Sequence, residues 1–146
     1  MDVILFSHTH WDREWYRPFQ TFRLRLCEVI NALVSEFDKG ETELFYLDGQ
    51  TIVLEDYLEL YPKNEARIRE LIKAGKQFIG PFYVLPDEFL VSGESLMRNL
   101  LIGINQAKQY GCNEFFGYLP DSFGHNSQMP KILSSFGLKR AVLRRG

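Results

Sequence analysis

The residues of this chain best suited to chemistry lie near its N-terminus, in the segment Ser7–Tyr16. The segment follows a short apolar run and contains two histidines, two carboxylates, an arginine and two tryptophans. His10 and Asp12 are two residues apart, and alternate side chains of an extended segment point to the same side. An imidazole and a carboxylate that face one point are typical ligands of a divalent transition metal such as zinc.

Asp121 is the best candidate for a third ligand, because it comes almost directly after a predicted strand. Together with His10 and Asp12 it would offer one imidazole and two carboxylates to a metal ion. The spacing of the first two residues alone is equally compatible with a turn, but the addition of Asp121 favours a metal site. A fourth ligand could be water, His8, His125 or a residue outside this sequence.

Several nearby polar residues have simpler structural explanations. His8 is more readily a hydrogen-bonded structural group than a ligand, and His125 more readily anchors its own loop. Asp48 is followed by a glycine, so it is equally a residue at the edge of the site or a turn former. Arg13 and Glu14 are expected to be solvated or paired with each other.

Strands and helices are predicted to alternate along the whole chain. The apolar runs predict strands at 2–7, 44–47, 77–79, 114–119 and 140–143. Helices are predicted from Phe19 to Gly40, Thr51 to Pro62, 63–74, Ser92 to Gly111, and about Pro130 to Gly137. Thr51 and Ser92 are suited to cap their helices. This order predicts the α/β class, with a parallel sheet.

The candidate residues follow strands rather than precede them. In a parallel sheet all strands end at the same edge, so the loops after them converge there. The polar residues of these loops are His8, His10, Asp12, Asp48, Asp87, Glu88, Asp121, His125 and Arg145. The flat apolar side chains are Trp11, Trp15, Tyr16, Phe82 and Phe123. Carboxylates, a metal and aromatic faces together suit a sugar, whose rings stack while its hydroxyl groups bind metal and carboxylate.

Composition excludes several other classes of protein. The chain has 146 residues, enough for one domain or part of one, and a net charge of -2 with both signs mixed. We therefore expect no nucleic-acid partner, and no apolar run approaches membrane-spanning length. Two cysteines without metal or redox spacing indicate the reducing cytoplasm. A homo-oligomer of the full-length protein stays open.

These motifs resemble those of glycoside hydrolase family 38, the α-mannosidases, in their bacterial form. The resemblance rests on His10-Trp-Asp12 followed by Trp15, on Gly80-Pro-Phe-Tyr-x3-Asp-Glu88, and on Asp121-Ser-Phe-Gly-His125 with Met129-Pro130. It spans the whole chain, in order. It implies that residues 1–146 are the N-terminal segment of a single catalytic α/β domain, truncated at the C-terminus. That segment would be the first part of a (β/α) barrel-like glycoside hydrolase domain.

The resemblance also implies a reaction. His10, Asp12 and Asp121 would bind one Zn2+, and Asp121 would also be the catalytic nucleophile. The family retains anomeric configuration, which requires one carboxyl group to attack while another donates a proton. The general acid and a fourth metal ligand, a histidine, would lie downstream of this chain. The isolated segment would then be inactive.

Three further residues would contact the substrate, an α-mannoside or mannosyl conjugate. By resemblance, Trp15 would stack on the sugar and Phe123 would line the same subsite. Arg145 would lie close to the nucleophile.

Two other functions remain open on sequence alone. Amidohydrolase-type metallohydrolases also begin with His-x-His at a first strand, but they need further histidines, and this chain has three in all. A non-catalytic carbohydrate-binding module could keep the same fold and metal. An acidic residue and a histidine downstream would favour the mannosidase.

Overall fold

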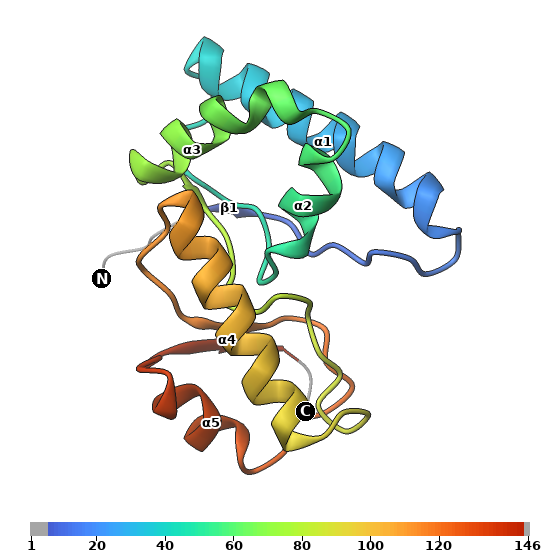
Figure 1. The fold of residues 1–146 in the computed structure, drawn as a ribbon, viewed down its shortest axis with the longest axis vertical. Coiled ribbons are helices and arrows are strands. Elements are labelled where there is room, and N and C mark those ends of the chain that lie inside the picture. The colour runs from blue at the N-terminus through green and yellow to red at the C-terminus, as the bar shows by residue number, and fades with distance from the viewer. Residues whose placement is uncertain (1–5, 145–146) are drawn as a thin grey trace.

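The computed structural model describes residues 6–144, in which helices and parallel strands alternate (Figure 1). The strands are β1 (Ser7–His8), β2 (Phe45–Tyr46), β3 (Gln77–Phe78), β4 (Gly117–Leu119) and β5 (Ala141–Leu143). The helices are α1 (Phe19–Lys39), α2 (Ile52–Leu58), the short 3-10 helix η1 (Pro62–Asn64), α3 (Glu65–Lys73), α4 (Gly93–Tyr110) and α5 (Met129–Ser135). None of the helices within this range has the length and apolar character needed to cross a bilayer.

All the strand pairs are parallel, which confirms the predicted α/β class. One sheet has the order β1-β2-β3, with Ser7 opposite Phe45 and Phe45 opposite Gln77. The other pairs β4 with β5, with Gly117 opposite Ala141. The described strands thus form two separate sheets, and closure into a barrel stays a prediction.

The outermost strands are more exposed than the sequence predicts. A buried strand is expected at 2–7, of which 2–5 lie outside the described residues; Phe6 and Ser7 are both exposed. All three residues of β5 are exposed as well. The physical reason is packing, because none of these residues belongs to either hydrophobic core, whereas Leu119 of β4 is buried in one of them.

Helix α4 contributes to both hydrophobic cores of the molecule. Its C-terminal half adds Ala107 and Tyr110 to a core formed mainly by α1, α2 and α3. Its N-terminal half adds Leu96 and Leu100 to a second core that contains α5. Figure 1 shows α4 running between the group of α1, α2 and α3 and the single helix α5. This helix therefore fixes the two halves relative to each other.

The predicted signals at Gly40 of α1 and Ser92 of α4 are confirmed, and the predicted cap of α2 is wrong. Helix α1 ends at Gly40, whose φ of 74° is left-handed, and Ser92 accepts a hydrogen bond from the Ser95 amide at 3.1 Å. Thr51 does not cap α2 through its side chain. Its hydroxyl group hydrogen-bonds instead to the Gln106 side chain on α4, so a tertiary contact replaces the local one.

Gly103 lets α4 lie directly against the loop that follows β3. A Cβ atom built on Gly103 would overlap the backbone of Pro81, Phe82 and Tyr83. The same loop is held there by Asn99, which accepts hydrogen bonds from the Tyr83 and Val84 amides at 2.7 and 3.0 Å. The close contact thus positions the loop that forms one side of the pocket described below.

We expect Gly103→Ala to destabilise the protein by about 1–3 kcal/mol, because backbone atoms on the facing loop cannot move aside. This loss opposes the gain of about 1 kcal/mol that alanine brings to a helix interior. Gly93→Ala is the matched control, since its Cβ would have nothing within 4 Å. Urea unfolding of both variants measures the difference, and equal stabilities would contradict the close approach.

Candidate metal centre

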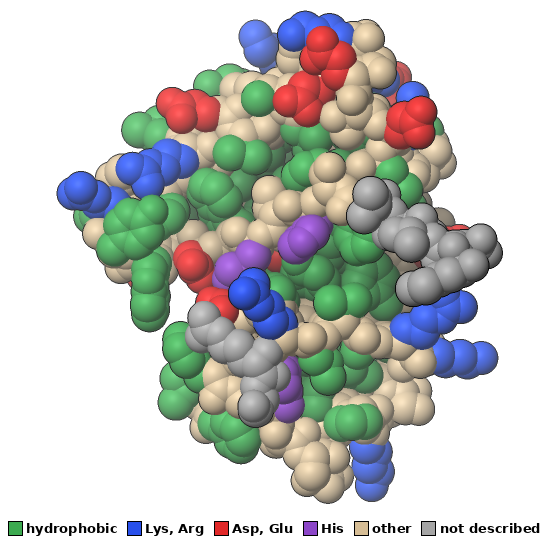
Figure 2. All heavy atoms as spheres, turned by 180° about the vertical axis from the view of Figure 1, so that it is seen from behind, with side chains coloured by type: hydrophobic (Ala, Val, Ile, Leu, Met, Phe, Trp, Pro, Cys, Tyr) green, Lys and Arg blue, Asp and Glu red, His purple; other side chains and the backbone are tan. Residues whose placement is uncertain are grey.

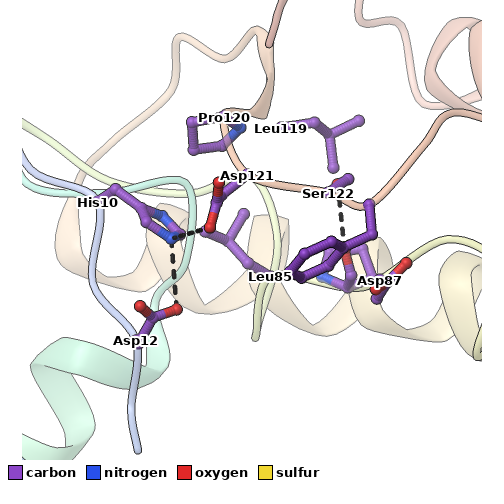
Figure 3. Close-up of a pocket in the computed structure, with 10 residues that line it drawn as sticks. His10, Asp12, Leu85, Asp87, Leu119, Pro120, Asp121 and Ser122 are labelled. Carbon is purple, nitrogen blue, oxygen red and sulfur yellow. Dashed lines mark hydrogen bonds and ion pairs between the residues drawn. The ribbon is translucent and has the colours of Figure 1, made fainter. Parts of the chain in front are cut away.

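Three side chains from distant parts of the sequence gather at one point in the structure. His10 Nε2 lies 3.3 Å from Asp12 Oδ1 and 3.7 Å from Asp121 Oδ2. One ligand atom from each residue lies within 4.8 Å of the other two. Ligands at about 2.0–2.2 Å from a tetrahedral zinc ion are about 3.4 Å apart, so the three residues fit a metal ion. Figure 3 shows the imidazole between the two carboxylates.

The centre is open to solvent and forms one end of a pocket. The His10 imidazole is 28% exposed and the two carboxylates are 46% and 33% exposed. The pocket has a volume of about 140 Å³, and its other walls come from Leu85, Pro86, Asp87, Leu119, Pro120, Ser122 and Phe123. Figure 2, which shows the molecule from behind, has histidine and acidic side chains side by side across its middle. A ligand in the pocket can therefore reach the metal centre.

The ligands meet because Tyr118 connects the two sheets. His10 and Asp12 follow β1, whereas Asp121 follows β4, and these strands do not pair. The Tyr118 hydroxyl group, on β4, lies 2.6 Å from His8 Nδ1 and donates to the carbonyl of Thr9 at 3.2 Å. Burial raises the pKa of Tyr118 to about 12, so this phenol stays protonated at neutral pH. His8 has the structural role that the sequence favoured.

Asp48 is neither a simple turn former nor an exposed residue at the rim. Its side chain is fully buried, and its carboxylate accepts hydrogen bonds from the amides of Gly49 and Trp11 and from Gln50 Nε2. Burial raises the pKa of Asp48 to about 7, against the opposing effect of these donors and of His10. The bond to Trp11 puts this residue directly behind the two ligands of the first loop.

His125 anchors its own loop, as predicted. Its Nδ1 lies 2.7 Å from Oε1 of Glu88, whose carboxylate is completely buried. The second oxygen of Glu88 accepts the Asn126 amide at 2.8 Å. The loop that carries Asp121 is therefore held by the loop after β3. The sequence indicated polar residues in that loop, Asp87 and Glu88. It did not indicate that Glu88 would be buried or that it would pair with His125.

The prediction that Arg13 is solvated or paired with Glu14 is wrong. Arg13 forms two hydrogen bonds with the buried Asp56 of α2, Nε to Oδ2 at 2.6 Å and Nη2 to Oδ1 at 2.8 Å. The guanidinium group also lies 4.5 Å from the centre of the Phe19 ring. Asp56 raises the pKa of Arg13. Six of the seven residues of α2 are buried, and the sequence alone did not show that Asp56 is one of them.

The three predicted substrate contacts have different outcomes. Phe123 lines the pocket, with 64% of its surface exposed. Trp15 is 69% exposed and is not among the residues that line the pocket. Arg145 lies outside the described residues. Of the other aromatic candidates, Phe82 is wholly buried in the second core, and Trp11 is half-buried against Phe22.

A family model for the N-terminal domain of the family 38 glycosyl hydrolases matches residues 1–146. The chain belongs to glycosyl hydrolase family 38. A putative mannosylglycerate hydrolase of Halalkalibacterium halodurans is 44% identical over 144 residues, which cover 97% of this chain and 16% of that protein. Alpha-mannosidase 2C1 of Mus musculus is 32% identical over 95% of this chain and 14% of its own length.

Solved structures agree with this family membership. The alpha-mannosidase of Enterococcus faecalis V583 superposes with a TM-score of 0.93 at 42% identity, over 97% of this chain and 16% of that one. A 4-alpha-glucanotransferase of Thermococcus litoralis shares only the fold, with a TM-score of 0.68 at 18% identity. The chain thus spans about 16% of the length of the Halalkalibacterium halodurans and Enterococcus faecalis V583 relatives.

We expect Arg13→Ala to lower the free energy of unfolding by about 1–3 kcal/mol, because it leaves the buried Asp56 carboxylate without its charged partner. The range extends down to about 1 kcal/mol because the guanidinium group is half-exposed, and solvent weakens its attraction to the carboxylate. Arg25→Ala is the matched control, since Arg25 also lies near an aromatic ring, 5.8 Å from the centre of Phe22, but its hydrogen bond to Tyr16 is long and exposed. Urea unfolding of the metal-free protein gives both values. Equal effects of the two substitutions would contradict a stabilising role for this pair.

Proposed function

We propose that this chain is the N-terminal part of the catalytic domain of a retaining, zinc-dependent α-mannosidase. The observation that carries the proposal is the meeting of His10, Asp12 and Asp121 at the end of a pocket, in a chain of family 38. Relatives at 44% and 32% identity are named as a putative mannosylglycerate hydrolase and as an alpha-mannosidase. Their names favour mannosides as the substrate class.

The metal would be held by the imidazole of His10 and the carboxylates of Asp12 and Asp121. A zinc ion bound there would act as a Lewis acid toward sugar hydroxyl groups. This chain would supply three of the protein ligands, and we expect the fourth from outside residues 1–146. The role of the chain is then to fix these ligands on two loops and to shape the pocket beside them.

In this proposal Asp121 is also the nucleophile. Its carboxylate attacks the anomeric carbon and forms a covalent mannosyl-enzyme, while a general acid protonates the departing oxygen atom. The same acid then takes a proton from water, which attacks the anomeric carbon and releases mannose with its configuration retained. We expect the acid and the fourth metal ligand to come from outside residues 1–146, so these residues alone would not turn over substrate.

The aromatic residues would recognise the sugar. Phe123 lines the pocket and offers an exposed ring face, and Trp15 is exposed in the loop after β1. We propose that both bind substrate. Arg145, which lies outside the described residues, stays a predicted substrate-binding residue. A mannosyl conjugate with a small polar aglycone agrees with the name of the Halalkalibacterium halodurans relative.

Other features of the whole protein follow the same proposal. The two parallel sheets would belong to one barrel-like catalytic domain, of which this chain is the N-terminal segment. A cytoplasmic location is supported by two free, buried cysteines, Cys27 and Cys112. A homo-oligomer of the full-length protein stays a prediction. The amidohydrolase alternative loses support, because it needs His8 on the metal and the candidate ligand group of the described residues does not include His8.

We expect the full-length protein that carries this chain to hydrolyse an aryl α-mannoside, and a chelator to abolish turnover until zinc is restored. Asp121→Asn should lower kcat by at least about a thousandfold, because it removes the nucleophile. Asp38→Asn is the matched control, since Asp38 pairs with Arg67 at the surface away from the pocket.

Two results would contradict the proposal. One is turnover that survives both the chelator and Asp121→Asn. The other is zinc binding by the wild-type protein without hydrolysis of any α-mannoside tested, which would favour a non-catalytic carbohydrate-binding module.

A further inference from the structure

The backbone of Trp11 lies between the two candidate ligands of the first loop, and buried side chains bind both its amide and its carbonyl group. Its amide donates to Asp48 Oδ2 at 2.9 Å, and its carbonyl group accepts from Gln50 Nε2 at 2.6 Å. His10 and Asp12 are the residues directly before and after it. The amide belongs to the peptide group shared with His10 and the carbonyl to the one shared with Asp12, so rotation of either group would change the angle between the two side chains.

We propose that Asp48 and Gln50 are positioning residues for the metal centre. They fix the backbone of Trp11 so that His10 and Asp12 face one ion. This inference rests on the proposed function, because it concerns the same site. Neither side chain reaches the metal group itself, which consists of His10, Asp12 and Asp121 among residues 6–144. Both therefore act through the backbone that carries two of the ligands.

In its ionised form Asp48 uses both oxygen atoms as acceptors. Oδ1 accepts from the Gly49 amide at 2.6 Å, and Oδ2 accepts from the Trp11 amide and from Gln50 Nε2, the latter at 2.8 Å. The side chain is completely buried, so water cannot replace any of these partners. In Asp48→Asn, an amide N–H would face another donor in either orientation of the side chain.

Gln50 uses both ends of its amide group to connect three loops. Nε2 donates to Trp11 after β1 and to Asp48 after β2, and Oε1 accepts the Leu85 amide after β3 at 3.1 Å. The orientation of the amide is determined by its partners, since two of them only accept and one only donates. Gln50 is 2% exposed, and its backbone lies opposite Phe82 in a parallel bridge. One buried side chain thus links the metal-bearing loop to the wall of the pocket.

A merely structural role for the pair would predict loss of stability without a specific effect on the metal. Ligand side chains must be held within about 0.5 Å of their productive positions. Loss of outer hydrogen bonds around metal ligands typically weakens metal affinity about 10- to 100-fold. A positioning role therefore predicts a loss of zinc affinity larger than a variant of similar stability shows, whereas a packing role predicts no such difference.

We would measure the zinc dissociation constant by competition with a chromophoric chelator, using the full-length protein that carries this chain. Gln50→Met keeps the length of the side chain but removes all three of its hydrogen bonds, and Asp48→Asn tests the partner of the Trp11 amide. Each should weaken zinc binding by about 10- to 100-fold. Visible absorption of the Co2+-substituted protein should change in the same variants, because the ligand geometry changes.

Asn99→Ala is the matched control. Asn99 is also an amide that bridges to the loop after β3, through the backbone of Tyr83 and Val84, but it does not touch Trp11. We expect it to lower thermal stability in the metal-free protein while its zinc affinity stays within about threefold of wild type. Urea unfolding of the metal-free variants gives the stability against which each affinity is compared.

The outcomes separate this inference from the proposed function. If the wild-type protein binds no zinc, the proposed function itself fails. If wild type binds zinc and hydrolyses an α-mannoside, but Gln50→Met and Asp48→Asn bind zinc as Asn99→Ala does, the positioning role is overturned and the function stands. If neither variant folds, the pair is required for folding and the positioning role is likewise overturned.

Discussion

Two sheets that share no strand pair must end at the same place before the candidate metal centre can form. Asp121 follows one sheet, and His10 and Asp12 follow the other. Tyr118 connects the two sheets, because its hydroxyl group contacts His8 and Thr9. Because this phenol is buried and stays protonated, it is a fixed donor at the junction.

The close packing at this junction depends on Gly49. A Cβ atom on Gly49 would lie 2.7 Å from the Tyr118 ring and 2.9 Å from the Tyr118 carbonyl oxygen. The glycine is therefore needed for space and not for an unusual backbone conformation. It stands between Asp48 and Gln50, so the residue that admits Tyr118 also separates the two side chains that hold Trp11. The packing of the sheets and the geometry of the ligands are thus built from the same three residues.

The loops around the pocket are connected mainly by buried polar side chains. Asp48 and Gln50 hold the loop after β1, Glu88 holds the loop after β4 through His125, and Asp56 holds Arg13. Buried polar groups cost free energy unless they are fully paired, so each contact constrains its geometry strongly. Apolar packing by the helices supplies the two cores, but it does not by itself orient the ligands.

Local sequence pattern determined the class of fold and the order of its elements. The apolar periodicity of α1, the glycine that ends it and the serine that caps α4 act over a few residues, so they can be read without knowing the rest of the chain. The metal group could also be anticipated, because parallel strands place their following loops at one edge. Thr51 was misjudged because a contact with Gln106, far along the chain, replaced the local cap.

Only the tertiary structure decided which charged residues are buried and which partners they have. Arg13 pairs with Asp56 across 43 residues, and His125 with Glu88 across 37. A carboxylate has the same identity whether it faces water or a core, so the sequence could not distinguish Asp48 in a turn from Asp48 behind the ligands. The sequence determined by itself which residues could bind a metal. The fold determined what holds them, since hydrogen-bond partners depend on positions that distant segments reach only after packing.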